Sequence, residues 1–313
     1  MNLVDCAMYP PFSPLQLLND PLFKRMGVEV YVLRLDQYHP QLSGNKYFKL
    51  KYNIAEAKDQ DCKQLISFGG AYSNHIHAMA LAGQQQNIST LGFIRGEETL
   101  PLNDTLLDAV NAGMRLHYVS REEYRKRNNP EYIKQLQLRY PNAYIIPEGG
   151  SNLLGVKGCM EIVDHIHHHI NDQFESIILP CGTAATLAGV AASTSNKTIF
   201  GVSVLKNAGY VAAEVNRYLI ELGLPDNGNW TVLQDYHCGG YGKVSVELAK
   251  FVDRFQQKND IPIEPIYSGK MFYALYNMLD EGLLTDTRIV AIHTGGLQGF
   301  SGMKKKYNKL LSA

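Results

Sequence analysis

The run Ser43-Gly44-Asn45-Lys46-Tyr47-Phe48-Lys49 is followed, about one helix later, by Gly69-Gly70-Ala71-Tyr72-Ser73-Asn74-His75. The first run places a lysine amine beside a tight glycine turn. The second run is typical of a loop that ends a strand and opens a helix, where free backbone N–H groups favour a bound anion. Together the two runs predict an amine able to form a Schiff base, facing a site for a carboxylate or phosphate.

Short β-rich runs alternate with helical patterns along the chain. Several runs, such as Ile177-Ile178-Leu179, are apolar at every position, as parallel strands buried on both faces are. The alternation predicts an α/β fold with parallel sheets and crossover helices. The predicted strands are 28–33, 65–68, 90–94, 116–119, 144–146, 176–179, 199–204 and 288–293, and the predicted helices are 47–59, 74–85, 104–112, 130–139, 156–170, 184–193, 244–256 and 270–279.

Glycines follow four of the predicted strands, either directly or after one or two residues. They are Gly69-Gly70, Gly149-Gly150, Gly182 and Gly295-Gly296. Ligands of open parallel sheets bind beyond the carboxyl ends of the strands. Four such loops therefore favour a cofactor cleft over a set of unrelated turns.

The composition limits the kind of protein. The chain has 313 residues, 45% of them apolar and 19% charged, which is enough to bury a sizeable core. Lys and Arg number 30, as do Asp and Glu, and this balance argues against a broad nucleic-acid or anionic-membrane surface. A local basic pocket for one phosphate remains compatible with it.

Targeting and redox signals are few. No apolar run approaches the roughly 20 residues that span a bilayer, and residues 1–14 lack the basic and apolar regions of a secretory signal. The cysteines are odd in number, scattered and without a CxxC pair, so reduced thiols in a cytoplasm are expected. They are Cys6, Cys62, Cys159, Cys181 and Cys238.

Lysine, serine and histidine candidates each have an ordinary alternative. Lys46 as a Schiff-base lysine would need burial or a neighbouring cation to lower its pKa, and Lys49 could supply that cation or hold a phosphate. The alternative is two solvated lysines on a surface helix. Ser73, Asn74 and His75 would lie in the first turn of a helix, where the alternative is a simple N-cap. A Schiff-base lysine opposite such a turn suits amino-acid chemistry with pyridoxal phosphate (PLP).

A second anion site is predicted at Pro180-Cys181-Gly182-Thr183-Ala184-Ala185-Thr186. The run lacks the Walker ending and is not GxGxxG, which argues against a nicotinamide-binding Rossmann protein. The hydroxyls of Thr183 and Thr186, with the N–H groups of the following helix, could bind one phosphate. Cys181 could be a nucleophile at that helix N-terminus, but a small buried thiol is the preferred interpretation.

Two tyrosines and a group of histidines complete the candidates. Tyr241 in Gly-Gly-Tyr-Gly and Tyr267 in Tyr-Ser-Gly-Lys are flanked by glycine, so their hydroxyls could reach a ligand; with 19 tyrosines in the chain, packing is the alternative. His165 and His169 have the spacing of a zinc pair, but no third ligand or HExxH motif accompanies them. We prefer a polar helix face for His165, His167, His168 and His169 and predict no metal.

Taken in order, the motifs Gly-Asn-Lys…Lys, Gly-Gly-x-x-Ser-Asn-His, Glu-Gly-Gly-Ser-Asn, Gly-Thr-x-x-Thr, Gly-Tyr-Gly, Tyr-Ser-Gly-Lys and His-Thr-Gly-Gly resemble one family. It is the PLP-dependent D-cysteine desulfhydrase and 1-aminocyclopropane-1-carboxylate (ACC) deaminase family. The resemblance runs from about Pro14 to Gly299. It implies PLP fold type II, the tryptophan-synthase-β-like fold, with two open twisted parallel-sheet domains and the cofactor cleft between them. The small domain would comprise 49–148, and the large domain 1–48 and 149–313.

The resemblance also implies roles. Lys46 would be the Schiff-base lysine, Asn74 would contact the phenolic oxygen of PLP, and Lys49 with the loop Gly182, Thr183, Ala184, Ala185 and Thr186 would hold its phosphate. Ser73, Asn74 and His75 would receive the substrate carboxylate, with Ser73 among the catalytic residues. Tyr241 and Tyr267 would face the substrate and take part in proton transfer or in handling the leaving group.

Ser268 and Thr294 help to choose between the activities. Deaminases of the family tend to carry Tyr-Glu-Gly and His-Leu-Gly-Gly, whereas this chain has Tyr-Ser-Gly and His-Thr-Gly-Gly, as desulfhydrases tend to. A glutamate near the pyridine nitrogen of PLP would strengthen the electron sink that ring opening demands, and hydroxyls would suffice for a good leaving group.

The expected reaction is PLP-dependent α,β-elimination on a small amino acid. The preferred substrate is D-cysteine, which would be converted to pyruvate, sulfide and ammonia. The alternatives are ACC deaminase, a D-serine-type deaminase, and a catalytically weak PLP-binding protein. The last is suggested by Ala184-Ala185, where relatives often carry glycine. Gly299-Phe300 also departs from the family, and 207–236 does not align. The resemblance further implies a homodimer. The cysteines predict a cytoplasmic protein, and the balanced charge and the lack of a long apolar run predict no nucleic-acid or membrane partner.

Overall fold

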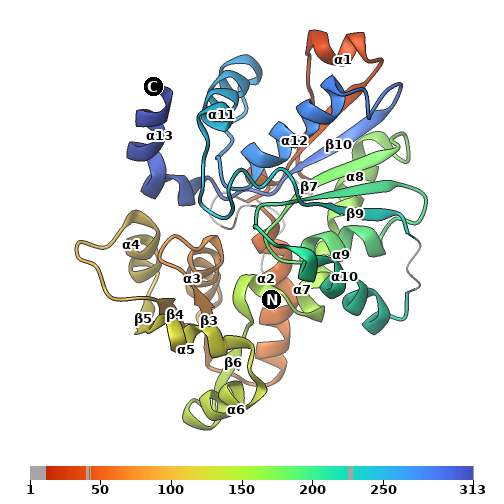
Figure 1. Cartoon of the computed structure of the whole chain (residues 1–313). Coiled ribbons are helices and arrows are strands. Elements are labelled where there is room, and N and C mark those ends of the chain that lie inside the picture. Colours follow the sequence, from red (N-terminus) through yellow and green to blue (C-terminus); the bar gives the residue numbers. More distant parts are fainter. Residues whose placement is uncertain (1–11, 40–41, 43, 225–227, 313) are drawn as a thin grey trace.

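The protein, a computed structural model, is described at residues 12–39, 42, 44–224 and 228–312; Cys6, Ser43 and most of the segment 1–14 lie outside these ranges. The strands form two separate sheets (Figure 1). The larger has the order β1-β2-β10-β7-β8-β9 and the smaller β5-β4-β3-β6. The strands are β1 (Leu15–Leu17), β2 (Glu29–Arg34), β3 (Gln64–Gly69), β4 (Ser89–Arg95), β5 (Met114–Val119), β6 (Ala143–Ile145), β7 (Ser176–Cys181), β8 (Thr198–Ser203), β9 (Trp230–Leu233) and β10 (Arg288–His293).

The larger sheet is buried on both faces because its side chains alternate between two hydrophobic clusters. Val32 and Ile178 face one cluster, and Leu33 and Ile177 face the other. Neighbouring strands are parallel except β1, which runs antiparallel to β2. The first face is covered by α1 (Pro21–Arg25), α11 (Val246–Asn259), α12 (Ser268–Asp280) and α13 (Lys304–Leu311), and the second by α2 (Asn45–Asp59), α7 (Leu153–Met160), α8 (Ile162–Ile170), α9 (Ala185–Ala192) and α10 (Gly209–Glu221).

The smaller sheet is entirely parallel. Ile66 and Phe93 pack on one face, beneath α5 (Arg121–Arg125) and α6 (Pro130–Arg139). Leu65 and Met114 face α3 (Asn74–Gln86) and α4 (Asp104–Asn111), within the same cluster that contains Ile177 of the larger sheet. One apolar cluster therefore joins both sheets, and α2 runs through it.

All eight predicted strands and all eight predicted helical segments are present, with ends shifted by a few residues. The predicted helix 156–170 is wrong as a single element: α7 ends at Met160 and α8 begins at Ile162. The intervening Glu161 makes a tight turn, since its N–H bonds to the Gly158 carbonyl. The short or half-exposed elements β1, β9, α1, α5, α10 and α13 were not predicted.

The predicted domain division is not tested by the fold alone. The strands of the smaller sheet all lie between Gln64 and Ile145, inside the predicted range 49–148. The predicted boundary at Lys49, however, falls within α2, which continues unbroken to Asp59. The division therefore stays a prediction. None of the helices in the described part of the chain has the length and apolar character to cross a bilayer.

The packing of α2 against α7 sets the position of the lysine run. A methyl group added at Gly158 of α7 would overlap the backbone carbonyl of Phe48. The two helices can therefore approach this closely only because residue 158 has no side chain.

We expect Gly158→Ala to lower the free energy of unfolding by about 1–3 kcal/mol, because the added methyl overpacks the α2–α7 contact. The measurement is denaturant unfolding at a fixed PLP concentration. Gly209→Ala is the matched control, since Gly209 begins α10 and has no atom within 4 Å of its added methyl. Equal stability of the two variants would contradict this account of the packing.

Candidate active site

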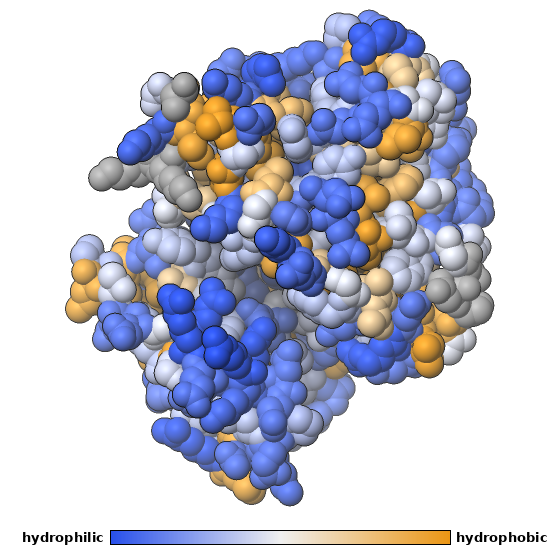
Figure 2. Space-filling view, viewed as in Figure 1, coloured by the Kyte–Doolittle hydropathy of each residue, from blue (hydrophilic) through white to orange (hydrophobic). Residues whose placement is uncertain are grey.

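A cavity of about 730 Å³ opens between the two sheets. Figure 2 shows this face hollowed, with hydrophilic residues gathered along the lower edge of the hollow. The residues that follow β3 and β7 line it from opposite sides, as the rule for parallel sheets predicts. Most of the predicted site residues line this cavity: Lys46, Lys49, Ser73, Asn74, His75, Gly182, Thr183, Thr186, Tyr241, Tyr267 and Thr294.

Lys46 enters the cavity from the first turn of α2. Gly44 precedes the helix with a φ of 75°, and a side chain there would collide with the carbonyl of Thr294. The N–H of Asn45 donates to that carbonyl over 3.2 Å, which fixes the start of the helix. The Nζ of Lys46 lies 3.0 Å from the Oδ1 of Asn45. Burial, with the charge of Lys49, lowers the pKa of Lys46 to about 7, so the surface-lysine alternative does not hold.

Lys49 and Thr183 form the polar centre of the glycine loop after β7. Lys49 is 1% exposed, and its Nζ donates to the Oγ1 of Thr183 over 2.9 Å. The ring of Tyr267 lies against Gly182, where an added Cβ would come within 2.9 Å of it. The loop thus offers an ammonium, a hydroxyl and the N-terminus of α9 to one anion.

Thr186 and the two alanines complete the loop. The Oγ1 of Thr186 accepts a 2.9 Å bond from the Nδ2 of Asn45, so the hydroxyl proton remains free to be donated elsewhere. Ala184 and Ala185 are fully buried in the apolar cluster and do not line the cavity. Ala184 has an ordinary helical φ of −70°. The absence of glycine at these positions therefore puts no strain on the loop.

Ser73, Asn74 and His75 open α3 as predicted. The Oγ of Ser73 accepts a 3.3 Å bond from the N–H of Ile76, so it is an N-cap as well as a cavity residue. The Oδ1 of Asn74 accepts a 3.0 Å bond from the Nε2 of Gln298. That bond leaves the amide N–H groups of Asn74 as the donors available to a ligand.

His75 is a buried neutral imidazole. One ring nitrogen, Nε2, lies 2.8 Å from the Oγ of Ser67, while Nδ1 is buried without a hydrogen-bond partner. Burial, with the charges of Lys46 and Lys49, holds the pKa of His75 well below its usual value. An unpartnered polar atom of this kind is costly unless a bound molecule satisfies it.

Tyr241 and Tyr267 meet at the cavity wall with their rings edge to face and their centroids 5.9 Å apart. Burial raises the pKa of Tyr267 well above its usual value, so its hydroxyl stays protonated. Tyr241 is 47% exposed. The packing alternative is therefore wrong for Tyr241.

Ser268 does not line the cavity. It is fully buried, and its Oγ accepts a 3.0 Å bond from the N–H of Glu264. The carboxylate of Glu264 in turn accepts bonds from the N–H groups of Tyr267 and Ser268, each over 2.8 Å. This carboxylate caps the start of α12 and thereby holds the backbone of Tyr267.

The remaining candidates lie outside the cavity. His165 is buried, with its Nδ1 accepting a bond from the N–H of Ser13, so the polar-face interpretation is wrong for this histidine. His168 and His169 are exposed. No group of three metal-ligating side chains occurs among the described residues. Cys181 is a buried thiol whose pKa burial raises to about 12.

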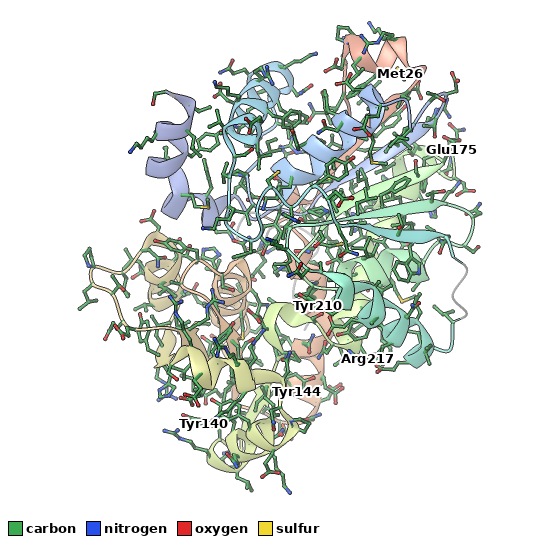
Figure 3. The ribbon with its side chains drawn as sticks, viewed as in Figure 1. Met26, Tyr140, Tyr144, Glu175, Tyr210 and Arg217 are labelled. Carbon is green, nitrogen blue, oxygen red and sulfur yellow. The ribbon has the colours of Figure 1, made fainter. Side chains whose placement is uncertain are left out.

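Several cavity residues were not among the predicted site residues, although Asn45 and Glu148 lie within the quoted motifs. Gln298 is one, and its role appears only through its bond to Asn74. Glu148 is another: it binds the hydroxyl of Tyr124 over 2.6 Å and forms an ion pair with Arg127. Others come from α10, whose Tyr210 and Arg217 are labelled in Figure 3. A cavity position depends on distant segments, so the local patterns did not show that these residues reach the cavity. They are Asn45, Arg95, Arg127, Glu148, Tyr210, Glu214, Arg217 and Gln298.

The residues present fit PLP. A lysine amine with a pKa of about 7 has a substantial neutral fraction at neutral pH, which suits condensation with an aldehyde, and Lys49 with the Thr183 loop suits a phosphate. Two mainly parallel sheets with a cleft at the carboxyl ends of their strands, together with this lysine and anion loop, match a PLP enzyme of fold type II.

Comparison with known proteins supports this class. Residues 12–295 match the family described as pyridoxal-phosphate dependent enzyme, and the chain belongs to that family. It is 30% identical to a putative ACC deaminase of Thermotoga maritima, covering 97% of this chain and 99% of the relative. It is also 30% identical to a bifunctional D-cysteine desulfhydrase/ACC deaminase of Arabidopsis thaliana, covering 87% and 73%.

A solved structure has the same fold. The crystal structure of an ACC deaminase homologue has a TM-score of 0.86 and 27% identity, covering 97% of this chain and 95% of that one. The predicted resemblance, the fold class, the cofactor and the assignment as an enzyme are thereby confirmed.

The pKa of Lys46 predicts how PLP uptake depends on pH. Only the neutral amine attacks an aldehyde, and the neutral fraction rises as the pH passes through about 7. We expect the rate at which apoprotein gains the visible absorbance of bound PLP to rise between about pH 6 and about pH 8 and then to level off. A midpoint near the ordinary lysine value, above about pH 10, would contradict the proposed burial of this amine.

Proposed function

We propose that the protein catalyses α,β-elimination on a small amino acid, most of all D-cysteine. The observation that carries the proposal is the position of Lys46. Its amine, with a pKa of about 7, lies in one cavity with the Lys49–Thr183 anion loop and the Tyr241–Tyr267 pair. A base, an anion site and two hydroxyl groups are what proton removal and departure of a β-substituent require.

Each residue then has a definite task. PLP supplies an aldehyde for the amines and a ring that withdraws electrons from the substrate's α-carbon. Lys46 Nζ holds PLP until substrate binds, and afterwards removes the α-proton. Asn74, Ser73 and His75 receive the carboxylate at the N-terminus of α3. Tyr241 or Tyr267 gives a proton to the departing sulfur, while Lys49 and Thr183 hold the phosphate.

The choice of D-cysteine rests on Thr294. Thr294 lines the cavity, and it carries a hydroxyl where deaminases of the family tend to carry leucine. The overall reaction would convert D-cysteine and one water into pyruvate, sulfide and ammonia. The elimination releases sulfide, and the water hydrolyses the remaining enamine to the keto acid and ammonia. A cytoplasmic homodimer remains a prediction from the sequence.

The test of this function is a joint assay of sulfide and pyruvate from D-cysteine, with L-cysteine, D-serine and ACC alongside. We expect equal amounts of sulfide and pyruvate from D-cysteine, and a loss of at least about 1,000-fold in kcat/KM for Lys46→Ala. Lys51→Ala is the control on the same helix, since Lys51 pairs with Glu161 outside the cavity. Visible PLP absorbance without products from any of the four would favour a PLP-binding protein.

ACC deamination is the second candidate, because relatives at 30% identity carry that name. Thr294→Leu should raise the ratio of ACC to D-cysteine turnover by about tenfold, corresponding to about 1.4 kcal/mol. Ser268→Glu is a poorer probe because it would bring a second carboxylate against the buried Glu264. An unchanged ratio in Thr294→Leu would mean that residue 294 does not select the reaction.

A further inference from the structure

Lys270 of α12 is a fully buried lysine that the proposed reaction does not use. It is 0% exposed, and its Nζ donates a 2.8 Å bond to the carbonyl oxygen of Gly240. Burying an ammonium is expensive, and one hydrogen bond offsets the cost only in part. The charged or titratable groups that face it are Glu264 and Cys238, and burial lowers the pKa of Lys270 to about 8. It is still mostly protonated at neutral pH.

The carbonyl that Lys270 binds belongs to the turn carrying Tyr241. The same oxygen accepts a 3.1 Å bond from the N–H of Lys243, which closes the turn. Gly239, Gly240 and Gly242 all have positive φ values, of 91°, 109° and 65°. Because glycine backbones are flexible, holding this three-glycine turn in one conformation costs conformational entropy.

Packing alone holds Tyr241 weakly. Its side chain is 47% exposed, and its contacts with Tyr267 are an edge-to-face ring contact and a hydrogen bond donated by the Tyr267 hydroxyl. Tyr267 is fixed from a different direction, because Glu264 binds its backbone N–H over 2.8 Å. Two residues near the start of α12 thus hold the two tyrosines: Glu264 holds Tyr267, and Lys270 holds the turn that carries Tyr241.

We propose that Lys270 is a positioning residue for Tyr241: its ammonium anchors the Gly240 carbonyl and keeps the Gly239–Gly242 turn closed, so that the Tyr241 hydroxyl stays in the cleft. The proposal rests on the proposed function for the role of Tyr241 in turnover. The anchoring of the turn itself does not depend on which substrate is used.

The first test is hydrogen exchange of the holoenzyme with Lys270→Met. Methionine has a similar length and removes a buried charge, so the fold should persist. We expect exchange of the backbone N–H groups of Gly240 and Lys243 to become about tenfold faster, while α12 beyond its first turn is unchanged. Unchanged exchange in the turn would overturn the proposal, as would an equal rise throughout α12, which would indicate general loosening.

Lys197→Met is the matched control. Lys197 is 7% exposed, and its Nζ also binds a backbone carbonyl, that of Asp172, over 2.9 Å; unlike Lys270 it has in addition an ion pair, with the Asp172 carboxylate over 3.0 Å. It precedes β8, at the end of the sheet opposite the cavity. We expect this variant to leave both turnover and exchange in the turn unchanged.

The second test is a double-mutant cycle with Tyr241→Phe. If Lys270 acts through the Tyr241 hydroxyl, Lys270→Met should lower kcat at least about tenfold in the native background and less than about twofold in Tyr241→Phe. Equal losses in both backgrounds would overturn the link to Tyr241. If the native enzyme turns over none of the substrates, the proposed function fails by itself, and the exchange experiment still decides the anchoring of the turn.

Discussion

Two lysines buried one helical turn apart are the constraint on which the rest of the site depends. Lys46 and Lys49 line the same cavity. The positive charge of each one makes it less favourable for the other to be protonated. The two lysines differ in how their charge is accommodated. The ammonium of Lys49 donates a hydrogen bond to Thr183, whereas the pKa of Lys46 is lowered to about 7. Burial, together with the positive charge at the two lysines, keeps His75 neutral. An amine that titrates near pH 7, a cation bound to Thr183 and a neutral imidazole therefore share one cleft.

The fold holds that arrangement through α2. This helix lies in the apolar cluster shared by both sheets, and its carbonyl at Phe48 touches Gly158 of α7. Its first turn is bound to the Thr294 carbonyl. Gly44 and Gly158 permit these close backbone contacts, because a side chain at either position would collide with a carbonyl.

Around this centre, side chains without chemistry of their own set the geometry of those that have it. Gln298 turns the Asn74 amide, Glu264 holds the backbone of Tyr267, and Lys270 binds the turn that carries Tyr241. Each uses a backbone group or an amide as its partner. Because such bonds fix direction, the hydroxyls and amides of the cleft are pre-oriented before a ligand binds.

The sequence alone determined the alternation of strands and helices and the glycine loops at strand ends, because burial and backbone freedom leave local patterns. It also predicted Lys46, Asn74 and Thr183 as site residues, and all three line the cavity. It did not reveal that Ser268 is turned towards Glu264, that His165 is buried, or that Gln298 and Glu148 reach the cavity. Those positions are decided by segments far apart in the chain. Burial, orientation and pKa are properties of the assembled cleft, and only the tertiary structure sets them.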